Sequence, residues 1–292
     1  HLPLSNDAIL EAQMLMLQAH NILNPANGAP ITVPAQDMVL GLYYITKLRK
    51  GAKGEGLTFY GPEEALIAYN EGKVDIHAIV NVVVKDLDKD GKIVDVMMKE
   101  TSVGRVIVNE IVPAEVGYLN TIISKKSLRD IISDVIKAVG VARACEFLDG
   151  IKNLGYYMAF KGGLSFNLGD IIIPKEKEEL VKRGNEEVEQ IMMNYNMGFI
   201  TDNERYNQVI DTWTHVNSDL SDILYKTIKN DDQGFNSVFM MLDSGARGSK
   251  EQIRQLSGMR GLMAKPQRAR SEEHTSELQS PWHRGCRRLL EK

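Results

Sequence analysis

The chain has few cysteines and no long apolar run, and both absences narrow the possibilities. Only two cysteines occur, Cys145 and Cys286, which is typical of a reducing compartment and excludes a zinc site built from cysteines. No apolar run approaches the roughly 18 residues of a membrane-spanning helix, so we expect none. The first residue is His1, and no charged and apolar leader follows it. The sequence therefore predicts no signal peptide, and the missing initiator methionine predicts a fragment.

The charge balance limits the contacts with nucleic acid. The formal net charge of −4 argues against a protein that binds nucleic acid over most of its surface, so any contact with a polyanion must be local. Hydrophobic residues make up 43% and charged residues 25% of the chain, as in ordinary globular proteins. A length of 292 residues allows a substantial core and about two domains.

The segment Phe235–Pro266 carries the main candidate site. The apolar run Val238–Leu242 ends at a loop of small residues with two glycines. Ser249, followed three residues later by Gln252, forms a capping-box pattern that predicts the start of a helix.

Three basic side chains lie around this predicted helix start. Arg247 is on the glycine loop, and Lys250 and Arg254 follow in the first turns of the helix. Free backbone N–H groups, the positive end of a helix and guanidinium groups all favour a phosphate. From the residues alone, two interpretations stay open: a phosphate site, or a solvated basic helix after an ordinary loop.

Two parts of this segment read Asp-Ser-Gly-Ala-Arg-Gly-Ser and Gly-Met-Arg-Gly-Leu-Met-Ala-Lys-Pro. They resemble the largest catalytic subunit of bacterial RNA polymerase, the beta-prime subunit. The resemblance implies that Arg247 reaches the triphosphate of the incoming nucleotide and that Arg254 lies near the same pocket. Other segments resemble the same family, and the similarity covers about Leu2–Gln267. The other segments that resemble this family are Asn21–Gly28, Val33–Asp37, Gly41–Tyr44, Thr101–Arg105 and Lys161–Pro174.

The end of the chain looks foreign to this family. Arg268–Lys292 resembles a translated sequencing adapter, so we assign no metal or catalytic role to His274, His283 or Cys286. We expect this tail to be disordered and to make no contacts with the rest.

Apolar periodicity and turn residues predict a mixture of helices and strands. We expect a helix at Asn6–Ala19, buried on more than one side, and further helices at Gln36–Leu48, Pro62–Asn70, Ser127–Val139 and Val141–Leu148. Strands are expected at Ile76–Lys85, Lys92–Met98 and Arg105–Glu110, and a short buried strand at the end of Lys161–Pro174. Cys145 lies in an apolar context without a nearby histidine, so we interpret it as a core residue.

The segment Asp86–Asp90 begins like a calcium-binding loop, and its alternating carboxylates could also suggest a Mg²⁺ triad. However, position 12 of the loop is Met97 where a glutamate is needed, and lysines lie among the carboxylates. Asp-Gly between two strands is a hairpin signal, so we predict a plain turn without metal. The aspartate triad by which the resembled family holds its metal is absent from this sequence.

An antiparallel helical hairpin is expected from Lys175–Asn196 and Asp202–Ile228. The second helix has apolar residues spaced 4, 3, 4 and 3 apart, which is a packing seam, and Thr201 with Glu204 forms a capping box. The resemblance implies the rim helices of the polymerase's secondary channel, where channel-inserting regulatory proteins dock. Arg205, Tyr206 and Asn207 match the region of a guanosine tetraphosphate site in some members.

The sequence therefore predicts an α+β multidomain fragment: a mixed helix and strand pore domain, an antiparallel helical hairpin, and the start of a helical substrate-pocket domain. The expected division follows the resembled family. Residues 1–17 end the active-site barrel, 18–175 form the pore domain (domain 3), 176–235 the funnel with its rim hairpin (domain 4), 236–267 begin domain 5, and 268–292 are the non-native tail.

The resemblance implies transcription of DNA into RNA from ribonucleoside triphosphates by a DNA-directed RNA polymerase, a cytoplasmic, nucleoid-associated enzyme. Its Mg²⁺ ligands would lie outside this fragment, which we expect to be inactive alone. The implied partners are the alpha, beta, omega and sigma subunits, template DNA, nascent RNA, nucleotides and channel-inserting factors, with no membrane. The alternative is a free-standing adaptor whose helical hairpin binds a partner.

Overall fold

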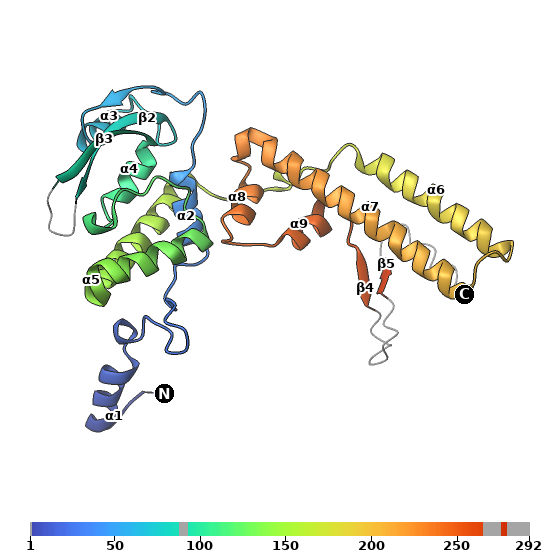
Figure 1. The fold of residues 1–292 in the computed structure, drawn as a ribbon, viewed down its shortest axis with the longest axis horizontal. Helices are drawn as coiled ribbons and strands as arrows, with labels where there is room; N and C mark the ends of the chain where they lie inside the picture. The colour runs from blue at the N-terminus through green and yellow to red at the C-terminus, as the bar shows by residue number, and fades with distance from the viewer. Residues whose placement is uncertain (1, 88–92, 265–275, 279–292) are drawn as a thin grey trace. The chain divides into compact units, whose positions relative to one another are not determined.

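The computed structural model describes residues 2–87, 93–264 and 276–278. The chain divides into two compact units (Figure 1). Unit 1 comprises His1–Ser165 and Met240–Arg247, and unit 2 comprises Phe166–Phe239 and Gly248–Lys292. The observed mixture of helices and small sheets agrees with the predicted α+β class.

The first helix of unit 1 is shorter and more exposed than predicted. α1 covers Asn6–Glu11, and a π-helical turn (η1, Ala12–Met16) and a 3₁₀ turn (η2, Gln18–His20) follow it. None of these residues is buried, so the predicted helix with several buried sides is wrong. A six-residue helix without packing partners is marginal, and here no described residue covers its apolar side chains.

Two helices form the main core of unit 1. α2 (Asp37–Thr46) packs against α5 (Lys125–Gly162), and Val39, Leu42 and Ile45 of α2 are fully buried. The helices approach closely where both have glycine, because a Cβ on Gly41 would lie 2.0 Å from the carbonyl oxygen of Gly155. α2 lies within the predicted helix Gln36–Leu48.

α5 corrects two predicted boundaries. It begins after Ser124, whose side chain accepts a hydrogen bond from the N–H of Ser127, rather than at Ser127 itself. It also continues to Gly162, where we expected two helices that end at Leu148. The backbone of Gly140 is not helical (φ 79°, ψ 175°), so α5 consists of two helices joined at this residue, which confirms the predicted division after Val139.

A three-stranded sheet forms the second core of unit 1. β1 (Thr58–Phe59) pairs in parallel with β2 (Ile79–Leu87), and β2 pairs in antiparallel with β3 (Ile93–Ser102). This pairing confirms the predicted hairpin of strands. α3 (Pro62–Asn70), which has the predicted bounds, and α4 (Val103–Asn109) pack on the sheet, as Figure 1 shows.

The predicted strand Arg105–Glu110 is wrong, because Arg105–Asn109 belong to α4 and Glu110 follows the end of that helix. Ser102 caps the helix by accepting from the N–H of Arg105 (3.2 Å). Valines favour strands in general, but here Val103, Val106 and Val108 are buried by packing, which overrides the local preference. A 3₁₀ turn, η3 (Ala114–Val116), follows.

Unit 2 opens without the predicted buried strand. Asn167 accepts hydrogen bonds from the N–H groups of Gly169 and Asp170, which winds the chain into the 3₁₀ turn η4 (Leu168–Asp170). Ile173, expected inside a strand, is 59% exposed. The prediction failed because local capping by an asparagine side chain competes with extended structure.

The helical hairpin of unit 2 is confirmed. α6 (Lys177–Asn196) and α7 (Asp202–Asn230) pack along each other, and Trp213, Val216 and Leu220 form the predicted seam. The capping box of Thr201 and Glu204 is present. The seam does not reach the loop end of α6, because Tyr195 is exposed.

The remaining elements are short. η5 (Asp231–Gly234) leads to α8 (Ser237–Asp243), whose residues from Met240 onward belong to unit 1. α9 (Lys250–Ser257) begins at the predicted capping box of Ser249 and Gln252. β4 (Leu262–Ala264) pairs with β5 (Ser276–Leu278). The expectation that the tail makes no contacts is wrong for these three paired residues, because backbone pairing does not depend on an apolar side-chain pattern. The rest of Arg268–Lys292 lies outside the described residues.

Candidate functional site

The loop that carries Arg247 is fixed in unit 1 by its own backbone. Ser244 is buried, and its carbonyl oxygen accepts from the N–H of Lys125 (2.9 Å) at the start of α5. The N–H of Arg247 donates to the carbonyl oxygen of Met241 (3.2 Å), which closes the turn after α8. Gly245 has φ +69°, so the tight turn needs a residue without a side chain.

The guanidinium of Arg247 faces the first residue of α2. Nε lies 3.2 Å from Oδ1 of Asp37, and Nη2 lies 3.5 Å from Oδ2. Both side chains stay half exposed, at 53% and 49%. The carboxylate of Asp37 therefore orients the guanidinium of Arg247 while the side chain stays accessible to solvent, and its remaining N–H groups can reach a ligand.

Asp37 is the site residue that the sequence did not single out. It follows Gln36, which has a positive φ of 52°. The only signal was that Asp37 ends the segment Val33–Asp37, which resembles the same family as the arginine loop. No spacing rule could have paired two residues that are 210 positions apart.

A second contact ties the residue before the loop to α2. The hydroxyl of Tyr43 donates to Oδ2 of Asp243 (2.7 Å), and Lys47 lies over the Tyr43 ring, 5.2 Å from its centroid. Burial lowers the pKa of Lys47 to about 8, against the opposing effect of Asp243. The loop is thus held at two points along the same short helix.

Arg254 belongs to unit 2. It follows the capped start of α9, and its Nη2 forms an ion pair with Glu251. Its side chain is only 20% exposed, and its Nε is buried without a hydrogen-bond partner among the described residues. Lys250, the third predicted cation, lies over the Tyr225 ring at 4.6 Å. The side chain of Arg254 is thus much less exposed than that of Arg247.

The hairpin residues singled out by the sequence are close to the turn between α6 and α7. Arg205 bonds to Oδ1 of Asp202 through Nε (3.1 Å) and Nη2 (2.6 Å) and stacks on Tyr195, 5.1 Å from its ring centroid. The hydroxyl of Tyr206 is buried without a partner among the described residues, and Asn207 is exposed. Arg205 therefore stiffens the hairpin end, whereas Asn207 is open to a partner.

The same end exposes apolar side chains. Phe199 is 75% exposed and Met197 66%, and Met192, Met193 and Tyr195 are exposed on the adjoining turn of α6. An exposed apolar group of this kind on a rigid hairpin is typical of a protein contact.

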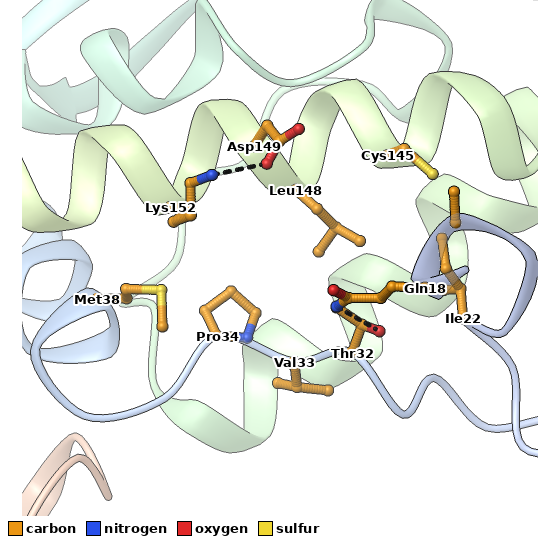
Figure 2. A pocket seen from close by; sticks show the side chains of 11 residues that line it. Gln18, Ile22, Thr32, Val33, Pro34, Met38, Cys145, Leu148, Asp149 and Lys152 are labelled. Atoms are coloured by element: carbon orange, nitrogen blue, oxygen red, sulfur yellow. Dashed lines mark hydrogen bonds and ion pairs between the residues drawn. The ribbon is translucent and has the colours of Figure 1, made fainter. Parts of the chain in front are cut away.

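A cavity of about 450 Å³ lies in unit 1 between η2, the segment before α2, and α5 (Figure 2). Ile22, Pro34 and Leu148 give it apolar walls, and Lys152, paired with Asp149 at 2.8 Å, lies at its edge. The thiol of Cys145 lines it. Cys145 packs at the edge of the core, so it is only partly the core residue that we predicted.

No metal centre or membrane span is found in the described part of the chain. Within residues 2–87, 93–264 and 276–278, no group of three His, Cys, Asp or Glu could hold a metal ion. No helix among the same residues is long and apolar enough to cross a membrane. The turn predicted at Asp86–Asp90 lies largely outside the described residues, with Asp86 itself on β2.

Two family models match the chain. "RNA polymerase Rpb1, domain 3" matches residues 21–171 and "RNA polymerase Rpb1, domain 4" matches residues 200–285. The second match runs past Gln267, where we expected the similarity to stop. The free-standing adaptor gains no support from these matches.

Three similar proteins from different bacteria are all named DNA-directed RNA polymerase subunit beta'. The chain is 99% identical over 272 residues to the DNA-directed RNA polymerase subunit beta' of Phocaeicola vulgatus and 86% identical to that of Bacteroides fragilis. It is 57% identical over 274 residues to that of Flavobacterium johnsoniae. The matches cover 93%, 93% and 92% of this chain but 19% of each relative. The chain therefore belongs to the RNA polymerase Rpb1 family and corresponds to a segment of a bacterial beta' subunit.

Proposed function

We propose that this chain is a working part of a DNA-directed RNA polymerase, in which Arg247 binds the triphosphate of the incoming nucleotide. The reaction would be the transfer of a nucleotide to the growing RNA on a DNA template. The observation that carries this proposal is the half-exposed guanidinium of Arg247, fixed by Asp37 on a loop held by α2 and α5.

The chemistry of the arginine fits a phosphate. A guanidinium presents five N–H donors in a fixed fork, and Asp37 occupies only Nε and Nη2. A triphosphate can contact the remaining donors on the exposed side, and a charge-assisted contact of this kind contributes roughly 1.5–3 kcal/mol. Asp37 would then act as a positioning residue that keeps the fork at a constant angle.

The test uses an assembled polymerase with a changed beta' subunit. Arg247→Ala should lower kcat/KM for nucleotides about ten- to a hundredfold, and Arg247→Lys should restore only part of the loss. Arg143→Ala is the matched control, because this arginine also pairs with a carboxylate, Glu115, on the surface of unit 1. Combining Asp37→Ala with Arg247→Ala should add little to the loss, since the two side chains act as one unit.

Measurements of DNA binding distinguish a nucleotide contact of Arg247 from a contact to the DNA backbone. Duplex affinity and its salt dependence should be unchanged in Arg247→Ala, because the ligand is the nucleotide. Normal nucleotide use with a weakened, steeply salt-dependent duplex affinity would instead make Arg247 a contact to the DNA backbone.

Arg254 has a different position in the proposal. Its ion pair with Glu251 and its low exposure favour a role in holding α9, with the nucleotide contact as a secondary possibility for the intact enzyme. Arg254→Ala should therefore lower the stability of unit 2, whereas Arg247→Ala should not change the stability of unit 1 appreciably.

The hairpin would serve as a docking surface for regulatory proteins at the secondary channel. Its exposed Met197 and Phe199 favour a protein partner, and the carboxylates on α6 repel a phosphate backbone. The α6 carboxylates are Glu178, Glu179, Glu186, Glu187 and Glu189. Arg205, Tyr206 and Asn207 would lie at this surface.

The described residues do not fit a Mg²⁺ site, since they contain no suitable group of acidic side chains. We propose that the metal ligands of the enzyme belong to other segments and that this segment alone is inactive. The proposal includes the expected division into residues 1–17, 18–175, 176–235, 236–267 and 268–292. It also includes the other polymerase subunits, DNA and RNA as partners, and a cytoplasmic location.

A further inference from the structure

Strand β2 continues beyond the end of its neighbour β1. The parallel pairing of the two strands ends at Phe59↔Val82, after which the chain turns into α3, while β2 runs on to Leu87. The sheet order is β1-β2-β3, so no other strand lies along this side of β2 among the residues that the structure describes. Within the described residues, this edge of β2 therefore has no partner strand from Val83 onward.

The backbone groups of this edge belong to odd-numbered residues. The N–H of Asn81 donates across it to the carbonyl oxygen of Leu57 (2.9 Å), and successive residues of a strand alternate their sides. The peptide groups of Lys85 and its odd-numbered neighbours thus continue the same edge. A row of such groups is a template for another extended segment.

A cavity of about 690 Å³ lies at this point of unit 1. It is lined by Tyr60 and Pro62, where β1 ends, and by Val83 and Val84 of β2. Its floor is closed and apolar, because Val84 and Val106 are only 6% and 1% exposed, whereas Tyr60 is 91% exposed. A segment that continued the line of β1 would place alternate side chains over this floor.

The charges around the cavity select the occupant. Glu63, Glu64 and Glu110 line it and are exposed, and none of the described side chains in its lining is a lysine or arginine. The positive end of α3 is already offset by the two glutamates of its first turn. Two cations interact with the lining residue Tyr118: Lys99 lies over its ring at 5.5 Å, and Arg105 acts on it electrostatically. Arg105 is buried, and its guanidinium donates to Thr46 and Asn120. The net field favours a basic segment and disfavours nucleic acid.

We propose that this groove binds an extended basic segment of a partner protein, which joins the sheet as a strand beside β2 in line with β1. Backbone hydrogen bonds to the β2 edge would provide affinity, and the valine floor with its carboxylate rim would provide specificity. This binding is separate from the nucleotide contact of Arg247 and does not depend on it.

The probe is a fluorescein-labelled peptide, acetyl-Lys-Val-Lys-Val-Lys-Val-amide, titrated with the full chain and followed by anisotropy. It should bind at least tenfold more tightly than the same peptide with glutamate for lysine, and than a version N-methylated at alternate residues. Hydrogen exchange should slow at the amides of Val83–Leu87 when the basic peptide is present. Equal binding of the N-methylated peptide would exclude strand addition, and no binding at about 1 mM peptide would overturn the proposal.

Charge variants test the rim. Glu63→Lys and Glu110→Lys should each weaken the basic peptide about five- to tenfold, in line with reversing a surface charge next to a cation. Glu146→Lys is the matched control, since it reverses an exposed carboxylate on α5 outside the cavity. An equal effect of the control would mean non-specific charge attraction. Binding to the chain but not to an assembled polymerase would mean that another polymerase segment fills the groove, which excludes a separate partner.

Discussion

Gly41 is the position at which one added methyl group tests the packing of α2 against α5. A Cβ there would lie 2.0 Å from the carbonyl oxygen of Gly155 and 2.8 Å from the backbone nitrogen of Ala159. Both atoms belong to a helix backbone, so neither can rotate away. Gly41→Ala therefore forces the two helices apart.

The size of the effect follows from two opposing contributions. Alanine is better than glycine inside a helix by about 1 kcal/mol, which stabilises the variant. Overpacking a core costs about 1–3 kcal/mol, and the cost is at the upper end or beyond when backbone meets backbone. A shift of α2 also loosens Val39, Leu42 and Ile45, which are fully buried. We expect a net loss of roughly 2–4 kcal/mol in the free energy of unfolding of unit 1.

Hydrogen exchange with mass spectrometry measures this loss where it occurs, at the amides of α2 and α5. Gly150→Ala is a graded comparison, because its Cβ would meet only the Cγ2 of Ile111 (2.5 Å), which can move, so its loss should be smaller. Gly61→Ala is the control, since no atom lies within 4 Å of its Cβ. If Gly41→Ala left exchange unchanged or slowed it, the close crossing of the two helices would be refuted.

Three further predictions address other parts of the chain. The free energy of unfolding should rise by roughly 3 kcal/mol from pH 8 to pH 10.5 through Lys47. The pKa of Lys47 is about 8 in the folded protein, so across this range the unfolded state binds more protons than the folded state. Denaturant titrations should show this rise in the unchanged protein and not in Lys47→Met. Calorimetry should detect no Ca²⁺ or Mg²⁺ binding at Asp86–Asp90 tighter than about 10⁻⁴ M, and a tighter site would contradict the plain turn. In an assembled polymerase, Asn207→Ala or Arg205→Ala should weaken regulation by channel-inserting factors while basal synthesis continues; lost elongation with intact regulation would reverse the assignment.

Features that depend on neighbouring residues were predictable from the sequence. The capping boxes at Ser249 and Thr201 place the starts of α9 and α7 correctly, because each cap uses only a side chain and the next turn of backbone. The proline at the start of α3 and the seam of α7 are local signals of the same kind. The loop of Arg247 was likewise identified, together with its glycine turn.

Features that depend on distant packing were not predictable. Val103–Asn109 has a strand-like composition but forms α4, because the burial of Val103, Val106 and Val108 against other elements overrides the local preference. The partner of Arg247 could not be found for the same reason, since Asp37 belongs to another element. Resemblance pointed to both segments, but only the three-dimensional structure joins them.

The coupling of core and candidate site is concentrated in α2. Its first residue, Asp37, orients Arg247, and nearly two turns further on Tyr43 holds Asp243 just before the arginine loop. Between them lies Gly41, whose missing side chain sets the distance between α2 and α5. A displaced α2 would therefore move both anchors of the loop at once. Because the ion pair of Arg247 and Asp37 is half exposed and weak by itself, Asp37 can orient the guanidinium only if the buried crossing at Gly41 holds α2 in place.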